Sequence, residues 1–299
     1  MTVTPSSVDP FVEHRNLLFT VAYEMLGSAA DAEDVVQESW LRWAARNEES
    51  DRDEVRDPRA YLVRIVTRQS LNRLRSLSRR REDYVGEWLP EPLLTAPDVA
   101  EDVELAESVS IAMLTVLETL GPAERAVFVL REVFDTPYDE IAEAVGKSPA
   151  AVRQIAHRAK EHVAARRPRM QVKIDEQQAA VERFLAAVRG GGIDDLLAVL
   201  APDVVLVADG GGIANAVRKP VHGADRVAAF LGTAKRLALE FTSMPISLNG
   251  LPGARLDVPF DGSTTALSFV VEDGRITHIY AMRNPEKLQR LGEETPLQR

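Results

Sequence analysis

A run of arginines without acids is the feature of this sequence with the clearest chemistry. Residues 59–81 contain eight arginines and no aspartate or glutamate. Arg64, Arg68, Arg75 and Arg79 recur at steps of about one or two helical turns, so a helix here would carry a band of guanidinium groups along one side. Such a band suits the phosphate backbone of a nucleic acid. A solvated basic face is the alternative.

Polar and aromatic side chains accompany this band. Asn72 lies among the arginines, Tyr61 falls in the first turn of the same helix, and Trp43 belongs to the preceding helix. Aromatic rings can stack on unpaired bases, but at helical spacing they also fill cores. Both interpretations stay open for Tyr61 and Trp43.

A second basic block spans residues 147–173, where eight Lys and Arg accompany the single acid Glu161. Residues 138–163 are typical of a helix-turn-helix, because Gly146 permits a tight turn and Ser148-Pro149 can begin the next helix. The polar residues left on the outward side have the composition of a recognition helix for a major groove; they are Arg153, Gln154, His157 and Arg158. A purely structural helical hairpin is the alternative.

The elements that must position these groups are helical. Apolar periodicity predicts a helix from Phe11 to the break at Gly27-Ser28, a second with Asp31 as its N-cap, and a third beginning at Asp57-Pro58. Three residues, Asp34, Gln37 and Glu38, fall on the polar side of the second helix. Further helices are expected over residues 111–120, 123–134, 138–145 and from 148 onward.

The two basic regions are separated by an acidic connector. Residues 82–107 contain nine acids and no base, and Pro90, Pro92 and Pro97 disfavour a continuous helix. Trp88 and Leu89 are too apolar for solvent, so we expect the Trp88–Pro92 segment to dock on another domain of the chain. A flexible acidic tether is the alternative.

The last third changes from helices alone to helices with strands. Helices are predicted at residues 175–189, 194–200 and 223–237, with strands at 204–208 and near 239, 255, 266 and 275. The turns Asp261-Gly262 and Asp273-Gly274 mark hairpins. Asp209 with His222 could form an acid–base pair, although the three glycines after Asp209 favour a loop built for close packing.

Composition excludes several classes of functional site. The 299 residues carry a net charge of −10 and contain no cysteine, which excludes disulfides, thiolate metal sites and cysteine nucleophiles. His157 and His162 are five residues apart rather than the four that place two imidazoles on one helical face, so no metal site is expected. No cofactor, signal peptide or membrane span is expected, and the predicted location is cytoplasmic.

These motifs resemble a known family. DAEDVVQESWLRW, DPRAYLVRIVTRQSLNRLRS and GPAERAVFVLREVFDTPYDEIAEAVGKSPAAVRQIAHRAK are similar, in order and spacing, to regions 2 and 4 of the extracytoplasmic-function (ECF) sigma factors of bacterial RNA polymerase. YVGEWLPEPL, the DGGG at 209–212 and the NPEKL at 284–288 resemble the SigJ-type group, which carries a SnoaL-like C-terminal extension.

The resemblance implies a multidomain fold with two all-α domains and an α+β cone of the NTF2-like or SnoaL-like type. Its segments would be a region 2 domain at 8–81, an acidic linker at 82–107, a region 4 helix-turn-helix domain at 108–169 and a regulatory domain at 174–299. It also implies a transcription initiation factor, not an enzyme, whose partners are core RNA polymerase and promoter DNA. A small ligand in the cone is a further candidate partner, and no membrane partner is expected.

The resemblance also implies residue roles. Asp34, Gln37 and Glu38 would contact the clamp helices of the polymerase. The −10 element would face Tyr61, Arg64, Arg68, Asn72 and Arg75, and the −35 element would face Arg153, Gln154, His157 and Arg158. Interdomain regulation would involve Trp88, Leu89, Pro90, Glu91, Pro92, Asp209, Gly210, Gly211, Gly212, Asn284 and Pro285. Two other functions stay open: a helix-turn-helix repressor, and an NTF2-like enzyme with a DNA-binding appendage.

Overall fold

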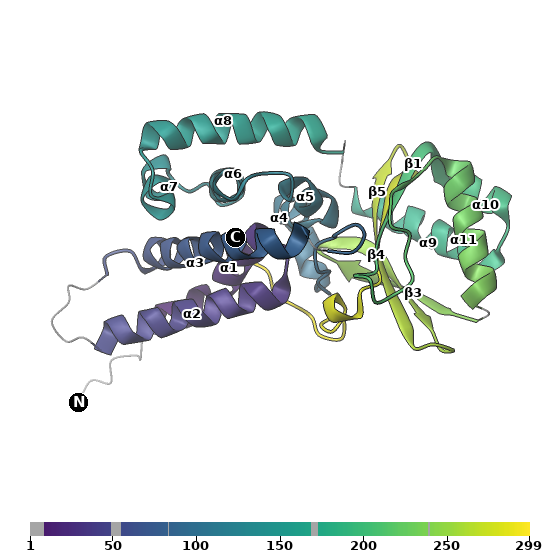
Figure 1. Ribbon diagram of the computed structural model, residues 1–299, viewed down its shortest axis with the longest axis horizontal. Coiled ribbons are helices and arrows are strands. Elements are labelled where there is room, and N and C mark those ends of the chain that lie inside the picture. The colour runs from purple at the N-terminus through teal and green to yellow at the C-terminus, as the bar shows by residue number, and fades with distance from the viewer. Residues whose placement is uncertain (1–8, 49–54, 83, 169–172, 239) are drawn as a thin grey trace. The chain divides into compact units, whose positions relative to one another are not determined.

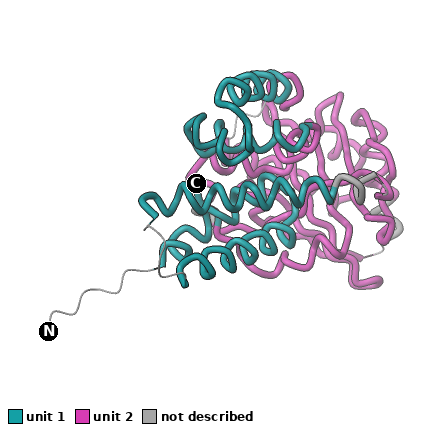
Figure 2. Tube along the Cα trace, turned by 60° about the vertical axis from the view of Figure 1, so that its left-hand side comes forward, with its two compact units in different colours: residues 1–78, 120–163, 297–299 teal, residues 79–119, 164–296 magenta. Residues whose placement is uncertain are grey.

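The computed structural model describes residues 9–48, 55–82, 84–168, 173–238 and 240–299. The chain forms two compact units, which are distinguished by colour in Figure 2. The first comprises 1–78, 120–163 and 297–299, and the second comprises 79–119 and 164–296. The 108–169 segment expected as one domain is therefore divided between the units, with 108–119 and the residues from 164 onward in the second.

The first unit begins with three helices whose ends follow from local capping. They are α1 (Pro10–Leu26), α2 (Ala29–Glu48) and α3 (Pro58–Glu82), which continues past the unit boundary. Gly27 ends α1 in the left-handed conformation, with φ 66°. The cap of α2 is Ser28, whose hydroxyl accepts from the Asp31 amide at 3.2 Å, so the prediction of Asp31 as the cap is wrong. Ser28 follows the turn glycine directly, so the helix starts three residues earlier than predicted.

The helix-turn-helix completes the first unit. Helix α6 (Pro122–Phe128) runs through a π-turn at Val129–Val133, followed by α7 (Tyr138–Val145) and α8 (Pro149–Arg166) (Figure 1). Gly146 adopts φ 68° at the turn, and the Ser148 hydroxyl accepts from the Ala151 amide at 3.2 Å. Both residues therefore act in the turn as the sequence predicted.

The second unit is built on one six-stranded sheet. The strand order is β2-β1-β6-β5-β4-β3, with β1 parallel to β6 and the other neighbours antiparallel. The strands are β1 (Leu200–Asp209), β2 (Val221–His222), β3 (Thr242–Leu248), β4 (Leu251–Val258), β5 (Ser263–Glu272) and β6 (Arg275–Met282). The helices are η1 (Pro97–Glu101), α4 (Val103–Val109), α5 (Ile111–Leu117), α9 (Ile174–Gly190), α10 (Ile193–Val199), α11 (Ala224–Ala238) and η3 (Pro285–Lys287).

Both faces of the sheet are covered. On one face, α9 to α11 pack against the sheet (Figure 1) and form an apolar core with it. In this core the ring centres of Phe184 and Phe269 are 5.0 Å apart. On the other face, Leu89 of the linker and Ile111 of α5 pack with side chains of the sheet. This burial explains why the linker, α4 and α5 join the second unit. The predicted fold class, helical regions followed by an α+β domain, is confirmed.

Three Gly-containing turns connect the antiparallel strands β3 to β6. The predicted turns at Gly262 and Gly274 are present, with φ 67° and 71°. The turn between β3 and β4, where Asn249 and Gly250 adopt φ 53° and 75°, was not predicted. An Asn-Gly pair between alternating apolar residues is a strong hairpin signal that could have located it.

Among the described residues, no helix is both long and apolar enough to cross a membrane. The same residues contain no cluster of three or more His, Asp or Glu placed to hold a metal ion.

Candidate functional site

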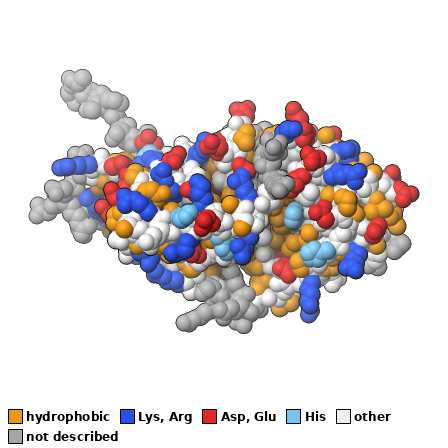
Figure 3. Space-filling model, turned by 90° about the horizontal axis from the view of Figure 1, so that it is seen from above, with side chains coloured by type: hydrophobic (Ala, Val, Ile, Leu, Met, Phe, Trp, Pro, Cys, Tyr) orange, Lys and Arg blue, Asp and Glu red, His pale blue; other side chains and the backbone are white. Residues whose placement is uncertain are grey.

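The outer face of α8 presents the four residues predicted to face the −35 element. Arg153, Gln154, His157 and Arg158 are all exposed, whereas Val152, Ile155 and Ala159 are buried against the unit. Figure 3 is seen from the side on which α8 lies, with basic side chains in blue and histidines in pale blue. The helix therefore buries an apolar stripe and leaves its hydrogen-bonding groups on the opposite side.

Three of these side chains have loose partners. The Arg153 guanidinium lies 5.5 Å from the Tyr138 ring centre, and His157 Nε2 is 3.8 Å from Glu161. The Arg158–Glu124 separation is 4.0 Å. Exposed contacts of this kind contribute little to stability, so exchanging them for contacts with DNA would cost little.

The basic face of α3 is partly occupied by α7. Arg64 Nη1 lies 2.5 Å from the Glu143 carboxylate, and Arg68 Nη2 donates to the Glu143 backbone carbonyl at 2.7 Å. Asn72 and Arg75, one turn further along, lie exposed and hydrogen-bond each other at 3.2 Å. Two of the predicted −10 arginines are thus held by the helix-turn-helix. The side chains of Arg79 to Arg81 lie outside the described residues.

Tyr61 and Trp43 have different environments. Trp43 is 4% exposed and its indole donates to Asp9 at 3.0 Å, so it belongs to the core. Tyr61 is half-buried between two cations, with the guanidiniums of Arg46 and Arg64 at 5.2 and 5.3 Å from its ring centre. Its ring lines a pocket of about 360 Å³ that also includes Arg42 and Arg68. An aromatic ring in a cationic pocket is suited to an unstacked base.

The predicted polymerase-contact residues share the exposed face of α2. Asp34 pairs with Arg73 Nη2 at 2.8 Å, and Glu38 accepts from Gln69 at 3.0 Å. Gln37 is exposed. Arg73 Nε also donates to Asp31 at 2.7 Å, so this arginine is turned towards α2 and does not join the band of Arg64, Arg68 and Arg75.

A buried arginine joins the two halves of the first unit. Arg125 in α6 is 3% exposed, and its Nη1 donates at 3.0 Å to the carbonyl of Met25, near the C-terminal end of α1. Burial lowers the pKa of Arg125 to about 10, so it stays protonated at neutral pH. The negative end of a helix dipole favours a cation there. Arg125 lies outside both basic blocks, so its contact was not predicted from the sequence.

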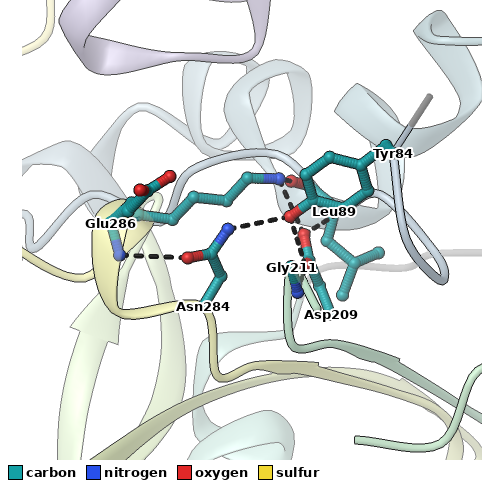
Figure 4. Close-up of polar contacts among 7 residues, drawn as sticks. Tyr84, Leu89, Asp209, Gly211, Asn284 and Glu286 are labelled. Atoms are coloured by element: carbon teal, nitrogen blue, oxygen red, sulfur yellow. Dashed lines mark hydrogen bonds and ion pairs between the residues drawn. The ribbon is translucent and has the colours of Figure 1, made fainter. Parts of the chain in front are cut away.

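In the second unit, Asp209 joins the linker to the sheet (Figure 4). Its carboxylate is 0% exposed and accepts from Tyr84 Oη at 2.6 Å, the Leu89 amide at 2.9 Å and Lys287 Nζ at 2.7 Å. The Gly211 amide donates to the same carboxylate at 3.0 Å. We call Tyr84, Leu89, Asp209, Asn284 and Lys287 the clasp.

Asn284 and Lys287 close the clasp from the C-terminal side. Asn284 Nδ2 donates to Tyr84 Oη at 2.9 Å, and the Lys287 ammonium lies 4.0 Å from the Trp88 ring centre. Burial and the hydrogen bond to Asp209 raise the pKa of Tyr84, which keeps its hydroxyl protonated as a donor. At Gly211 a Cβ would lie 2.6 Å from Asn284 Cγ, so only glycine fits.

A second anchor holds the linker near β3. The Asn249 side chain is fully buried; its Oδ1 accepts from the Leu93 amide at 2.9 Å and its Nδ2 donates to the Val109 carbonyl at 2.8 Å. The Asn249 amide donates in turn to the Leu93 carbonyl at 2.9 Å. Gly250 is needed beside it because a Cβ would lie 2.9 Å from the Ala106 Cα. Asn249 was not among the predicted site residues.

The other residues predicted for interdomain regulation lie around the clasp. Leu89, Pro90, Glu91 and Pro92 are buried and Trp88 is half-buried. Gly210 is buried at the end of β1, Gly212 packs beside Val85, and Pro285 begins η3 with its side chain exposed. The linker is therefore a docked segment over this stretch.

The acid–base pair considered for Asp209 and His222 is not formed. His222 pairs with Val205 in the sheet, four residues before Asp209, and four residues of strand span about 13 Å. Asp209 is also occupied by donors, whereas His222 is exposed. The Asp209 carboxylate therefore links parts of the fold and is not paired with His222.

Comparison with known proteins identifies both helical regions. Residues 11–80 match the family described as Sigma-70 region 2, and residues 110–163 match Sigma-70, region 4. The chain is 38% identical to ECF RNA polymerase sigma factor SigJ of Mycobacterium tuberculosis over 298 residues, covering 94% of this chain and 92% of the relative. It is 34% identical to the probable ECF sigma factor SigI of the same species, covering 94% of each chain.

A solved structure extends this similarity to the three-dimensional fold. The crystal structure of M. tuberculosis SigJ matches with a TM-score of 0.75 and 34% identity, covering 96% of this chain and 99% of that one. The motifs in the basic helices, the connector and the C-terminal domain thus occur in a chain that resembles SigJ over nearly its whole length. The protein belongs to the ECF sigma factors of RNA polymerase.

Proposed function

We propose that this ECF sigma factor reads the −35 element with α8 and the −10 element with α3, and that the clasp restrains the linker between them. Sigma factors are transcription initiation factors that bind core RNA polymerase and promoter DNA. The observation that carries the proposal is the outward face of α8, where Arg153, Gln154, His157 and Arg158 are exposed above a buried apolar stripe. A helix with this distribution can enter a major groove.

The −35 assignment predicts a position-specific effect for Arg153. Arg153→Ala should cost roughly 1–3 kcal/mol at one base pair, because a base-reading arginine is lost while phosphate contacts remain. Binding of the holoenzyme to promoters altered singly across the −35 element would measure this effect. Arg166→Ala, at the exposed end of the same helix, is the control and should leave base preference unchanged. Equal weakening on every promoter with Arg153→Ala would contradict the assignment.

The −10 element would contact Tyr61, Arg64, Arg68, Asn72 and Arg75. The half-buried ring of Tyr61 between two guanidiniums supports capture of an unstacked base, and the exposed Asn72–Arg75 pair supports contact with the same strand. Because Arg64 and Arg68 contact Glu143, the DNA strand must displace α7 to reach them. We propose that this contact holds the free factor in a state with weak promoter affinity.

The face of α2 would bind the clamp helices of core polymerase. Glu38→Ala should weaken core binding by about 1 kcal/mol, roughly fivefold, since an exposed charge at an interface is lost. Titration of labelled factor with core enzyme would measure this, with Glu48→Ala on the same helix as the control. Affinity for promoter DNA without polymerase should not change. If Glu38→Ala left core binding intact and reduced transcription only through DNA, a simple helix-turn-helix regulator would be the better interpretation.

The C-terminal domain would act through the clasp as a regulator without catalysis. The Asp209 carboxylate binds Tyr84, Leu89 and Lys287 and is inaccessible to solvent, so it is not available to exchange protons with a substrate. By holding Leu89, the domain fixes the segment that connects the two DNA-reading regions. This arrangement supports control of promoter access within one chain.

A further inference from the structure

A pocket of about 610 Å³ lies in the second unit, beside the clasp but outside it. Its walls are the loop 213–215, the β4–β5 turn at 261–264 and the segment that follows β6. Among the described residues, none of α9, α10 or α11 lines it; the space between those helices and the sheet is filled by the apolar core. The pocket is therefore separate from the interior of the cone.

The alternation of side chains along β4 places the pocket on the linker side of the sheet. Ala254 and Leu256 pack into the core beneath α9 to α11, so Arg255 between them points to the opposite face. That face carries the cluster formed by Leu89 and Ile111, to which Leu288 and Leu291 of the pocket wall also belong.

Two arginines give the pocket its chemistry. Arg255 Nε donates to both oxygens of Asp257, at 3.0 and 2.8 Å, and Asp257 also accepts the Thr264 hydroxyl at 2.6 Å. Within the part of the chain that the structure describes, the two Nη groups of Arg255 have no hydrogen-bond partner. Asp257 thus orients Arg255 and leaves one edge of its guanidinium open.

The second arginine, Arg283, follows β6. Its Nη1 donates to the Asn215 carbonyl, whereas its Nε is inaccessible to solvent and has no partner among the described residues. The charged residues that line the pocket are Arg255, Arg283 and the exposed Asp261. Asp257, which binds Arg255 Nε, offsets the charge of that arginine, so the positive charge of the lining comes mainly from Arg283 and the open edge of Arg255.

The remaining lining is substantially apolar. Ile213 is 60% exposed, and Pro285, Leu288 and Leu291 form the opposite wall. Arginine pairs with carboxylate and phosphate through parallel hydrogen bonds, and pockets of 300–1,000 Å³ hold small organic ligands. We propose that this pocket binds a small organic anion, a carboxylate or phosphate monoester with a short apolar chain, through Arg255 and Arg283.

The position of the pocket couples such a ligand to the clasp. Pro285 and Leu288 flank Lys287, whose ammonium binds Asp209 and the Leu89 carbonyl. The loop 213–215, which forms another wall of the pocket, comes directly after Gly210 to Gly212 in the chain. A bound anion would therefore hold the segments that form the clasp, and this consequence for transcription rests on the proposed function.

The test is calorimetric titration of the full-length protein with octanoate, hexyl phosphate and 1-octanol. We expect octanoate or hexyl phosphate to bind and 1-octanol to bind at least about tenfold more weakly, since it lacks the charge. Arg283→Gln should weaken binding of the anion about tenfold and Arg283→Lys less, with thermal unfolding used to show that both variants fold. Arg226→Gln, an exposed arginine of α11, is the matched control.

Failure of both anions to bind at millimolar concentration would overturn the proposal, and so would equal affinity in the Arg283→Gln and Arg226→Gln variants. Transcription with and without the bound anion tests the coupling separately. Binding without any change in transcription would keep the pocket and overturn its link to the clasp. Transcription that does not respond to disruption of the clasp itself would instead contradict the proposed function.

Discussion

Asp209→Ala is expected to release the linker from the C-terminal domain. The substitution removes the shared acceptor of Tyr84, Leu89 and Lys287 and leaves the Lys287 ammonium, whose side chain is 13% exposed, without its carboxylate. Breaking a buried ion pair from one side costs about 3–5 kcal/mol. We therefore expect a lower unfolding temperature for the second unit and rapid hydrogen exchange at the Leu89 amide.

Two further variants separate this effect from general damage. Asp203→Ala, an exposed aspartate of the same strand, should leave both measurements unchanged. Asp209→Ala combined with Lys287→Met removes both charges and should recover part of the lost stability, because no uncompensated charge stays buried. Protection of the Leu89 amide in Asp209→Ala equal to that in the unaltered protein would contradict the role of the clasp. In vitro transcription with the same variants shows whether the clasp restrains or supports initiation.

Glu143→Lys is expected to raise the affinity of the free factor for single-stranded −10 DNA. The Arg64–Glu143 pair is exposed, at 33% and 64% of the two side chains, and such a pair is worth up to about 1 kcal/mol. A lysine at this position replaces attraction to Arg64 by repulsion. The gain in DNA-binding free energy should therefore reach about 1–2 kcal/mol, which corresponds to roughly 5–30-fold in affinity. Glu143→Gln should give the smaller part of this gain.

A matched control distinguishes release of the arginines from added positive charge. Glu140 is exposed on the same helix, α7, so Glu140→Lys makes the same charge change. The residue that contacts Arg64, however, is Glu143. Fluorescence anisotropy with a non-template −10 oligonucleotide would compare the two. Equal gains from Glu140→Lys and Glu143→Lys would mean that α7 does not hold the arginines proposed to contact the −10 element. Binding to core polymerase provides a second readout of the same variants.

The sequence predicted features that are encoded locally. The apolar period of 3.6 residues placed the α3 band and the inward side of α8, and Gly146 with Ser148 marked the turn, because each depends on neighbouring residues. The motifs around Asp209 and Asn284 also suggested where the linker docks. What the local pattern could not supply was the partner of each polar group.

Partners far apart in the sequence account for what was missed. Arg64 meets Glu143 across 79 residues, and Asn249 reaches Val109 across 140. Arg73 belongs by spacing to the basic helix, yet Asp31 and Asp34 turn it towards α2. These choices depend on how helices and strands pack, and a single sequence carries no direct signal for that packing.

The order of the clasp residues along the chain has a consequence for protein synthesis. Tyr84 and Leu89 are bound by groups about 120 to 200 residues later, so the ribosome completes the helix-turn-helix before it makes Asp209, Asn284 or Lys287. At 5–20 residues per second, the roughly 120 residues from the end of the helix-turn-helix to Lys287 take about 6–25 s. During that interval the nascent sigma regions emerge before the clasp can form.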